Sequence, residues 1–342
     1  MSAVPEPRPQ DSTTSAGRLP VVSPALFRGL CVASLAAVVL IVVTGAAVRL
    51  TGSGLGCPDW PSCYRHQLTA QLSYHPLIEF GNRMVTVLLT ILVGVTFVAA
   101  FLRRPRRRDL TWLSAGLVAG VFAQAVLGGI VVYTKLNPYL VMVHFAASML
   151  LVVDGVVLLH RSDRQYGPGS GTLLVPRPIL LAARGMLALL AVVVMAGTAT
   201  TGAGPHAGGS SGQLVAKRLP IALRQMAELH SSLALLLIGL AVGLAVALHA
   251  LDVPERVRRG SRILVIVLMV QAAIGYAQYF SHLPALLVEL HVIGATTLVV
   301  GTVQFFLTLT HHPQELVSVS VPPAVTVPEV APAEPAGVHA GE

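Results

Sequence analysis

Charged residues are scarce in this chain. Asp, Glu, Lys and Arg together make up only 11% of its 342 residues, whereas soluble domains carry roughly 25%. Hydrophobic residues account for 54% of the sequence, and the mean hydropathy is +0.74. This composition excludes an ordinary soluble domain and indicates an integral membrane protein.

Acidic residues are fewer than basic ones, 15 against 23, which gives a formal net charge of +8. The basic residues lie mainly in short Arg clusters between long apolar runs. Membrane topology and contact with anionic lipid explain such clusters. We therefore expect membrane lipid, and no nucleic acid, as their partner.

The two ends of the chain lack long apolar runs. Residues 1–25 also lack the compact basic, apolar and small-residue pattern of a cleaved signal peptide, so the first apolar run is expected to be retained. Residues 311–342 are rich in Pro, Ala, Val and Glu. Both ends are predicted to be disordered tails.

Apolar runs close to the ~20 residues that cross a bilayer occur eight times in the sequence. The pattern therefore predicts an all-α integral membrane protein with eight transmembrane helices. Their expected positions are about 26–48, 77–102, 111–133, 139–160, 179–201, 222–250, 263–280 and 284–310.

Arginine clusters orient these helices. They lie at 103–108, at Arg161, Arg164 and Arg177, and between 256 and 262. By the positive-inside rule these loops are cytoplasmic, and so are both termini. The chain is thus expected to be a multi-pass protein of the cell membrane, with the loops at 49–76, 134–138, 202–221 and 281–283 on the outer face.

The two halves of the sequence resemble each other. Gln124 precedes His144 by 20 residues within FAQAVLGGIVVYTKLNPYLVMVHFAASMLLV, and Gln271 precedes His291 by 20 within MVQAAIGYAQYFSHLPALLVELHVIGATTLV. A duplication predicts two four-helix bundles of the same topology. We place them at 26–160 and 179–310, joined by a cytoplasmic linker at 161–178.

Three repeat-related histidines stand near the outer starts of helices: His144, His230 and His291. The fourth equivalent position is Asn82. A charge inside a membrane costs about 2.5 kcal/mol or more and usually marks function, although a neutral His can simply hydrogen-bond across helices. Three histidines at one depth favour axial heme ligation in a bundle, with His230 and His291 as the complete pair.

The first half pairs His144 with Asn82, which is not a usual heme ligand. Glu79 shares a helix face with Asn82, because the two are three residues apart. This half is expected to leave one face of its ligand open beside an acid or base. The alternative is an ion pair of Glu79 with Arg83, and Arg83 and Arg49 are also suited to carboxylates of a ligand.

Two other histidines are predicted to lie in or beside the outer loops, and the sequence favours no catalytic role for them. His75 stands at the start of the second helix and reads as an interface residue, with heme ligation as an alternative. His206 reads as a solvated loop residue.

Cysteine is rare, with three in the chain. Cys57 and Cys63 lie in the outer loop TGSGLGCPDWPSC, where an oxidising compartment favours a disulfide. Two unlinked thiols are the alternative. Cys31 reads as a small core residue.

Together these segments resemble the heme A synthase family, whose members oxidise a methyl group of heme O to the formyl group of heme A. The resemblance covers roughly residues 26–310. It rests on VVTGAAVRLTGSGLGCPDWPSC, IEFGNR, LVMVHFAASMLL, AELHSSLALLL and LVELHVIGATTLV.

The resemblance implies a role for each matching residue. His230 and His291 would ligate a resident b-type heme in the second half. In the first half His144 would bind substrate heme O, and Glu79 would be the essential carboxylate. Asn82 and Arg83, on the same helix as Glu79, are also expected to bind the substrate heme. Cys57 and Cys63 match the family's outer-loop pair. Asn82 departs from the family, which usually has His there, so His144 alone, or with His75, would hold the substrate iron.

The implied reaction passes through a hydroxymethyl intermediate and serves terminal oxidase biogenesis. Heme O synthase and oxidase assembly factors are the implied partners, with an electron acceptor that the sequence does not name. A homo-oligomer stays open. The alternatives are a diheme cytochrome b-like electron carrier to quinone and a heme transporter or chaperone.

Overall fold

The computed structural model describes residues 21–64, 67, 69–163, 172–209 and 216–311. Within these ranges it contains eight helices long and apolar enough to cross a membrane, and two strands of two residues each. The prediction of an all-α membrane protein with eight helices is confirmed. The predicted tails lie outside the described residues except at their inner ends, where α1 already begins at Pro24 and β2 ends at His311.

The helices are joined by short connections at 103–107, 134–137, 250–254 and 281–284, and by longer ones at 51–73, 163–176 and 204–222. Capping groups mark some of their starts: the Ser23 hydroxyl accepts the Leu26 N–H and the Asn137 amide oxygen accepts the Tyr139 N–H, each followed by a proline at the first helical position. The elements are α1 (Pro24–Leu50), α2 (Tyr74–Leu102), α3 (Arg108–Tyr133), α4 (Pro138–Ser162), β1 (Thr172–Leu173), α5 (Arg177–Ala203), α6 (Leu223–His249), α7 (Glu255–Phe280), α8 (Ala285–Thr308) and β2 (Thr310–His311).

Helix α7 begins earlier than the sequence predicted. The prediction placed the arginines between 256 and 262 in a loop, but they lie in the first turns of α7. Glu255 accepts from Arg258 at 3.0 Å and also pairs with Arg262, which supports a polar helical start. Hydropathy locates the apolar run, whereas the helix continues past it, and for the same reason α5 already begins at Arg177.

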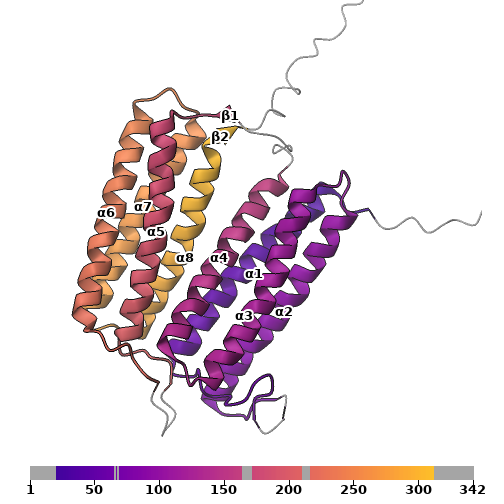
Figure 1. Cartoon of the computed structure of the whole chain (residues 1–342), viewed down its shortest axis with the longest axis vertical. Helices are drawn as coiled ribbons and strands as arrows, with labels where there is room; N and C mark the ends of the chain where they lie inside the picture. Colours follow the sequence, from indigo (N-terminus) through magenta and orange to yellow (C-terminus); the bar gives the residue numbers. More distant parts are fainter. Residues whose placement is uncertain (1–20, 65–66, 68, 164–171, 210–215, 312–342) are drawn as a thin grey trace, which may run out of the picture.

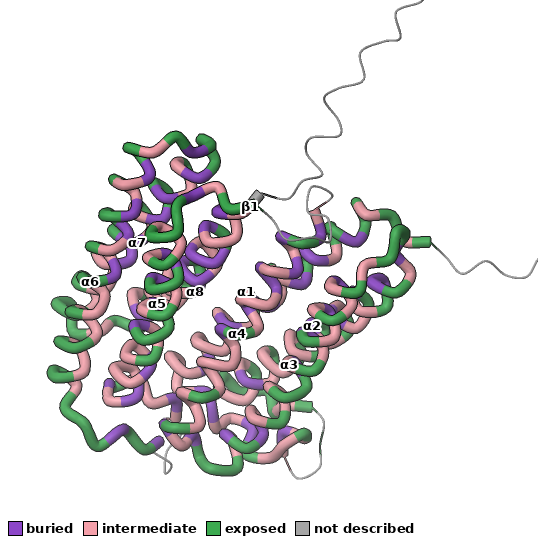
Figure 2. The backbone as a smooth tube through the Cα atoms, turned by 45° about the horizontal axis from the view of Figure 1, so that its top comes forward, coloured by how far each residue is buried: buried purple, intermediate pink, exposed green. Residues whose placement is uncertain are grey.

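Helices α1–α4 form one group and α5–α8 a second (Figure 1). In each group the helices pack on one another in chain order, and the last closes onto the first, α4 onto α1 and α8 onto α5. Helices α2 and α4 therefore lie across the interior of the first group from each other, as α6 and α8 do in the second. Many outward-facing turns, such as those of α6, are exposed (Figure 2), as expected for surfaces that meet lipid.

The two groups contact each other through α1, α4, α5 and α8. Near the starts of α4 and α8, the Gly54 N–H donates to Gly208 O at 2.9 Å, and Arg49 donates to Thr201 O at 3.1 Å and His206 O at 2.8 Å. Near the opposite ends of these helices, the side chains of His160 in α4 and Gln304 in α8 lie 3.3 Å apart.

Candidate functional site

Each of the four repeat-related side chains faces a glycine on the preceding helix. Asn82 faces Gly45, His144 faces Gly128, His230 faces Gly197 and His291 faces Gly275. A Cβ on these glycines would lie between 3.0 and 4.0 Å from the facing side chain. The small residues let polar rings and amides sit close to a neighbouring helix, as is common in membrane bundles.

His230 of α6 and His291 of α8 face each other in the second group. Their ring centres are 6.2 Å apart and the rings are inclined at 77°. Edge-to-face aromatic contacts fall in the same range. Two metal–nitrogen bonds of about 2 Å each, in line, would also place two imidazole centres about 6 Å apart, so the pair fits a shared iron.

The outer nitrogens of these rings differ in their partners. His230 Nδ1 lies 3.1 Å from Val193 O on α5, which fits an N–H donated to that carbonyl and leaves the Nε2 lone pair available to a metal ion. His291 Nδ1 is buried without a hydrogen-bond partner among the described residues, as is His144 Nδ1 in the first group. The donor set, two neutral imidazoles from facing helices, is that of a low-spin heme.

A glutamine contacts each of the two histidine backbones that follow a short loop. Gln124 of α3 donates through Nε2 to His144 O at 3.0 Å, and Gln271 of α7 donates to His291 O at 2.8 Å. In the sequence these glutamines only marked the duplication. Their contacts to the two histidines were missed, although the repeated spacing of 20 residues carried the signal.

Asn82 is engaged with α1 in the first group. Its Oδ1 accepts the Thr44 hydroxyl at 2.8 Å, and Thr44 directly precedes Gly45, which faces Asn82. The amide therefore occupies the place that His230 holds in the second group. The sequence could not reveal the Thr44 contact, because it joins residues on different helices.

Glu79 is buried, with 5% of its surface exposed, and both of its oxygens accept hydrogen bonds. Oε1 accepts from Arg83 Nη2 at 2.7 Å, and Oε2 accepts from the Cys57 N–H at 2.8 Å. The Glu79–Arg83 ion pair that the sequence left as an alternative is thus present. The carboxylate joins α2 to the outer loop.

Arg83 fixes the same loop from its other side. Its guanidinium donates to the carbonyl oxygens of four loop residues, at distances from 2.8 to 3.4 Å: Cys57, Asp59, Pro61 and Ser62. Cys57 and Cys63 form a disulfide, as the sequence favoured. Arg83 therefore donates to loop carbonyls and to Glu79, and its contact with ligand carboxylates stays a prediction.

The loop also covers the end of α3. Gly129 has no side chain where Trp60 packs, since a Cβ there would lie 2.7 Å from the indole. The Tyr133 hydroxyl donates to Trp60 O. Because Gly128 faces His144, the loop that carries Glu79's partner packs beside the helix turn that contacts this histidine.

Three other predicted residues lie at the junctions of elements. His75 Nδ1 is 3.0 Å from the Ser53 hydroxyl at the start of α2, as an interface residue would be. Arg49 donates to backbone carbonyls of the second group rather than standing free for a ligand. His206 is not a solvated loop residue: it is partly buried, and its Nε2 donates to Leu283 O at 2.8 Å.

Two intramembrane acids escaped the sequence reasoning, although each interrupts an apolar run. Glu289 stands two residues before His291, and both of its oxygens are buried without a hydrogen-bond partner in the described part of the chain. Asp154 lies in α4 opposite Gly116, where a Cβ would lie 2.9 Å from its carboxylate. Both are partly buried.

Comparison with known proteins adds to this geometry. The model of the COX15-CtaA family, described as cytochrome oxidase assembly protein, matches residues 28–303. Heme A synthase of Geobacillus kaustophilus (strain HTA426) is 35% identical over 124 residues, 35% of this chain and 38% of the relative. Heme A synthase of Listeria welshimeri serovar 6b is 33% identical over 133 residues, 37% of this chain and 43% of the relative. The matched region spans less than half the length of these relatives.

Proposed function

The chain belongs to the COX15-CtaA family of cytochrome oxidase assembly proteins, and we propose that it is a heme A synthase that oxidises a methyl group of heme O. The relatives that carry this name support the assignment. The observation that carries it is that the two halves place different polar side chains at equivalent positions. One half has two facing histidines, and the other has a histidine, an amide and a buried carboxylate.

The second half is the proposed site of a resident b-type heme. His230 and His291 would hold its iron from opposite faces, with Gly197 and Gly275 leaving room at the rings. A heme held by these two histidines would supply one-electron transfer. This half would pass electrons onward to an acceptor in the membrane.

The first half is the proposed site of the substrate, heme O. His144 would hold the substrate iron from α4, while Asn82, already hydrogen-bonded to Thr44, supports the opposite side without a strong iron ligand. An iron with one protein ligand has an open position, which distinguishes a reactive centre from an electron-transfer centre.

Glu79 is the proposed catalytic carboxylate. Held by Arg83 and the Cys57 N–H, it is positioned to orient or deprotonate water, or to stabilise positive charge at the reacting carbon. Arg83 would act as a positioning residue, because it holds the carboxylate and the loop together. The methyl group would become a hydroxymethyl group and then the formyl group.

The cellular setting follows from this reaction and from the Arg clusters. We propose that the Cys57–Cys63 loop and the start of α2 face the outer side of the cell membrane. The partners would be the heme O synthase that supplies the substrate and the oxidase assembly factors that use the product.

Expression together with a heme O synthase in a host without heme A tests the proposal. Extracted hemes are separated and weighed by mass spectrometry, with an empty vector as control. Heme A in the extract supports the assignment. Unchanged heme O contradicts it. In that case, two bis-histidine spectra would indicate a diheme electron carrier, and heme bound without redox change would indicate a transporter or chaperone.

A further inference from the structure

For each of the three histidines, the residue one helical turn before its facing glycine contacts that histidine. Four residues before Gly197 stands Val193, whose carbonyl lies 3.1 Å from His230 Nδ1. Four residues before Gly275 and Gly128 stand Gln271 and Gln124. Since residues four apart share a helix face, each of these three residues lies on the same face of its helix as the glycine that meets the histidine ring.

The two glutamine sites have complementary atoms without partners. The amide Nε2 of each glutamine donates to the backbone oxygen of its histidine, at 2.8 Å for Gln271 and 3.0 Å for Gln124. The Oε1 atoms of both glutamines and the Nδ1 atoms of both histidines are buried and have no hydrogen-bond partner among the described residues. An acceptor and a donor therefore lie on the same pair of residues, in both halves.

The rings are turned toward these glutamines' helices. His291 presents its Cε1 and Nδ1 edge to Gly275, with 3.1 Å and 3.6 Å from the glycine's Cβ position to these atoms. His144 presents Cε1 to Gly128 at 3.5 Å. The edge of His291 that carries Nδ1 thus faces the side of α7 on which Gln271 stands, and Cε1 of His144, which is bonded to both ring nitrogens, faces the side of α3 on which Gln124 stands.

We propose that Gln271 and Gln124 are positioning residues that accept the Nδ1–H of His291 and His144 through Oε1 and so direct Nε2 of each ring at a heme iron. The inference rests on the proposed function, because it needs heme in both halves. It gives His291 and His144 the acceptor that Val193 O already gives His230. A ligand histidine needs such an acceptor, which fixes its tautomer and raises its basicity.

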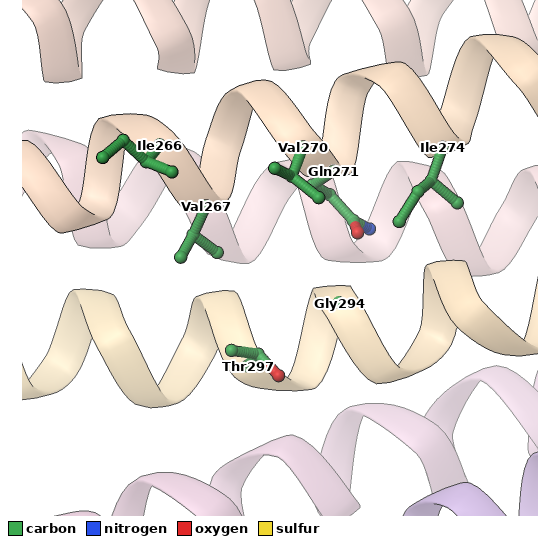
Figure 3. Close-up of a pocket in the computed structure, with 7 residues that line it drawn as sticks. All are labelled: Ile266, Val267, Val270, Gln271, Ile274, Gly294 and Thr297. Carbon is green, nitrogen blue, oxygen red and sulfur yellow. The ribbon is translucent and has the colours of Figure 1, made fainter.

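Local packing allows the glutamine to reach across. In Figure 3, Gln271 extends from α7 toward α8 beside Gly294. Any side chain at Gly294 would collide with Gln271 Oε1. Gln271 is 9% exposed, so its amide is held in the helix interface rather than in lipid. In the first half Ser148 contacts Gln124 Nε2 and donates to His144 O at 2.9 Å, which anchors the same amide.

Two substitutions at Gln271 separate this role from a structural one. Gln271→Leu removes the acceptor, so the electron-donating power of His291 falls and the midpoint potential of the low-spin heme rises. Heme affinity, measured by titration of heme into the apoprotein, falls about 10–100-fold. Gln271→Glu strengthens the acceptor and lowers the midpoint potential. Opposite shifts in the two variants, measured by redox titration of the purified protein, support the proposal.

The matched control is Gln304→Leu, which makes the same change near the other end of α8, where the amide contacts His160. Its potential should equal that of the wild type. Shifts of one sign in both Gln271 variants would overturn the proposal, because both variants lose the donor to His291 O. Unchanged potentials would overturn it too. If Gln271→Leu retains no heme, Gln271→Glu alone decides, by a fall in potential or its absence.

His291→Ala distinguishes failure of this inference from failure of the proposed function. A low-spin spectrum that survives His291→Ala overturns both the ligand assignment and the role of Gln271. A spectrum that His291→Ala abolishes, with potentials that Gln271 variants leave unchanged, overturns only the role of Gln271. For the first half, Gln124→Leu should weaken binding of added heme O about 10–100-fold. Binding equal to that of the wild type would overturn the role of Gln124.

Discussion

Among single residues, Glu79 is buried and has both of its carboxylate oxygens hydrogen-bonded. A carboxylate in a membrane helix is costly unless its charge is compensated, and here an arginine and a backbone N–H supply the compensation. One donor comes from α2 itself and the other from the outer loop. The carboxylate is thus a fixed charge at the junction of α2 and the outer loop, which suits a group that acts on a bound molecule without moving.

Glu79→Gln should lower heme A output about 10²–10⁴-fold, the usual contribution of a positioned acid or base. Heme O or its hydroxymethyl derivative should accumulate, since the variant keeps the shape but not the charge. Heme extraction and mass analysis measure the ratio. Glu228→Gln is the control, because Glu228 pairs with Arg224 in an exposed ion pair on α6. Full heme A output from Glu79→Gln would contradict the assigned role.

Asn82→His should convert the first half into a copy of the second. The imidazole would stand opposite Gly45 as His230 stands opposite Gly197, and would supply a second axial ligand. Heme bound there should become low-spin, and methyl oxidation should fall because the open position is closed. Optical and electron paramagnetic resonance spectra of the variant check this, with Asn82→Ala as the control that adds no ligand. A spectrum identical to that of Asn82→Ala would refute the equivalence of the two positions.

Sequence patterns located residues better than their contacts. The duplication placed three histidines and Asn82 at equivalent positions, and the structure gives each of them a facing glycine. The partners of Glu79 and Asn82 were not predictable in full, since Cys57 N–H and Thr44 approach from other elements. Arg83 was at the right place, but the loop carbonyls it binds depend on how residues 57–63 fold back.

Among the elements, the outer loop is held to α2 by a single arginine. Arg83 bonds to four loop carbonyls and to Glu79, and its side chain is only 16% exposed. The disulfide closes the loop on itself, whereas Arg83 fixes the closed loop to α2. Both restraints are needed to hold the Cys57 N–H against Glu79, so loss of either should release this donor.

Arg83→Met should loosen the loop without removing the disulfide. Breaking a buried ion pair from one side costs about 3–5 kcal/mol, so the unfolding temperature in detergent should fall. A reductant should also open Cys57–Cys63 faster, as measured by alkylation of the released thiols over time. Arg224→Met removes the exposed partner of Glu228 and should change neither quantity. Wild-type stability and reduction rate in Arg83→Met would show that the loop is held by other contacts.

Element boundaries were predictable only where hydropathy changes. All eight helices were found, but α7 starts at Glu255 because its first turns are polar and carry ion pairs. Periodic apolar residues mark the part of a helix that contacts lipid or protein core. The part that projects beyond the membrane leaves no such mark.

At the scale of the whole molecule, the orientation in the membrane can be tested directly. Ser281→Cys lies in the exposed connection of α7 to α8, and Asp252→Cys in the exposed connection of α6 to α7. A membrane-impermeant maleimide added to intact cells should label the first and spare the second until the membrane is opened. Cys31 is buried and the other two cysteines are joined, so the background is low. The reverse pattern would invert the assigned topology.

The contact of α4 with α8 has a consequence for the path of electrons. These helices pack against each other across the boundary of the two groups, and His144 and His291 both lie near the end of the second turn of their helices. Packed helix axes are about 8–10 Å apart. If His144 holds the substrate and His291 the resident heme, as proposed, an electron would need to tunnel through one layer of protein between them. The α4–α8 interface that joins the two halves would then also be the route of electron transfer between them.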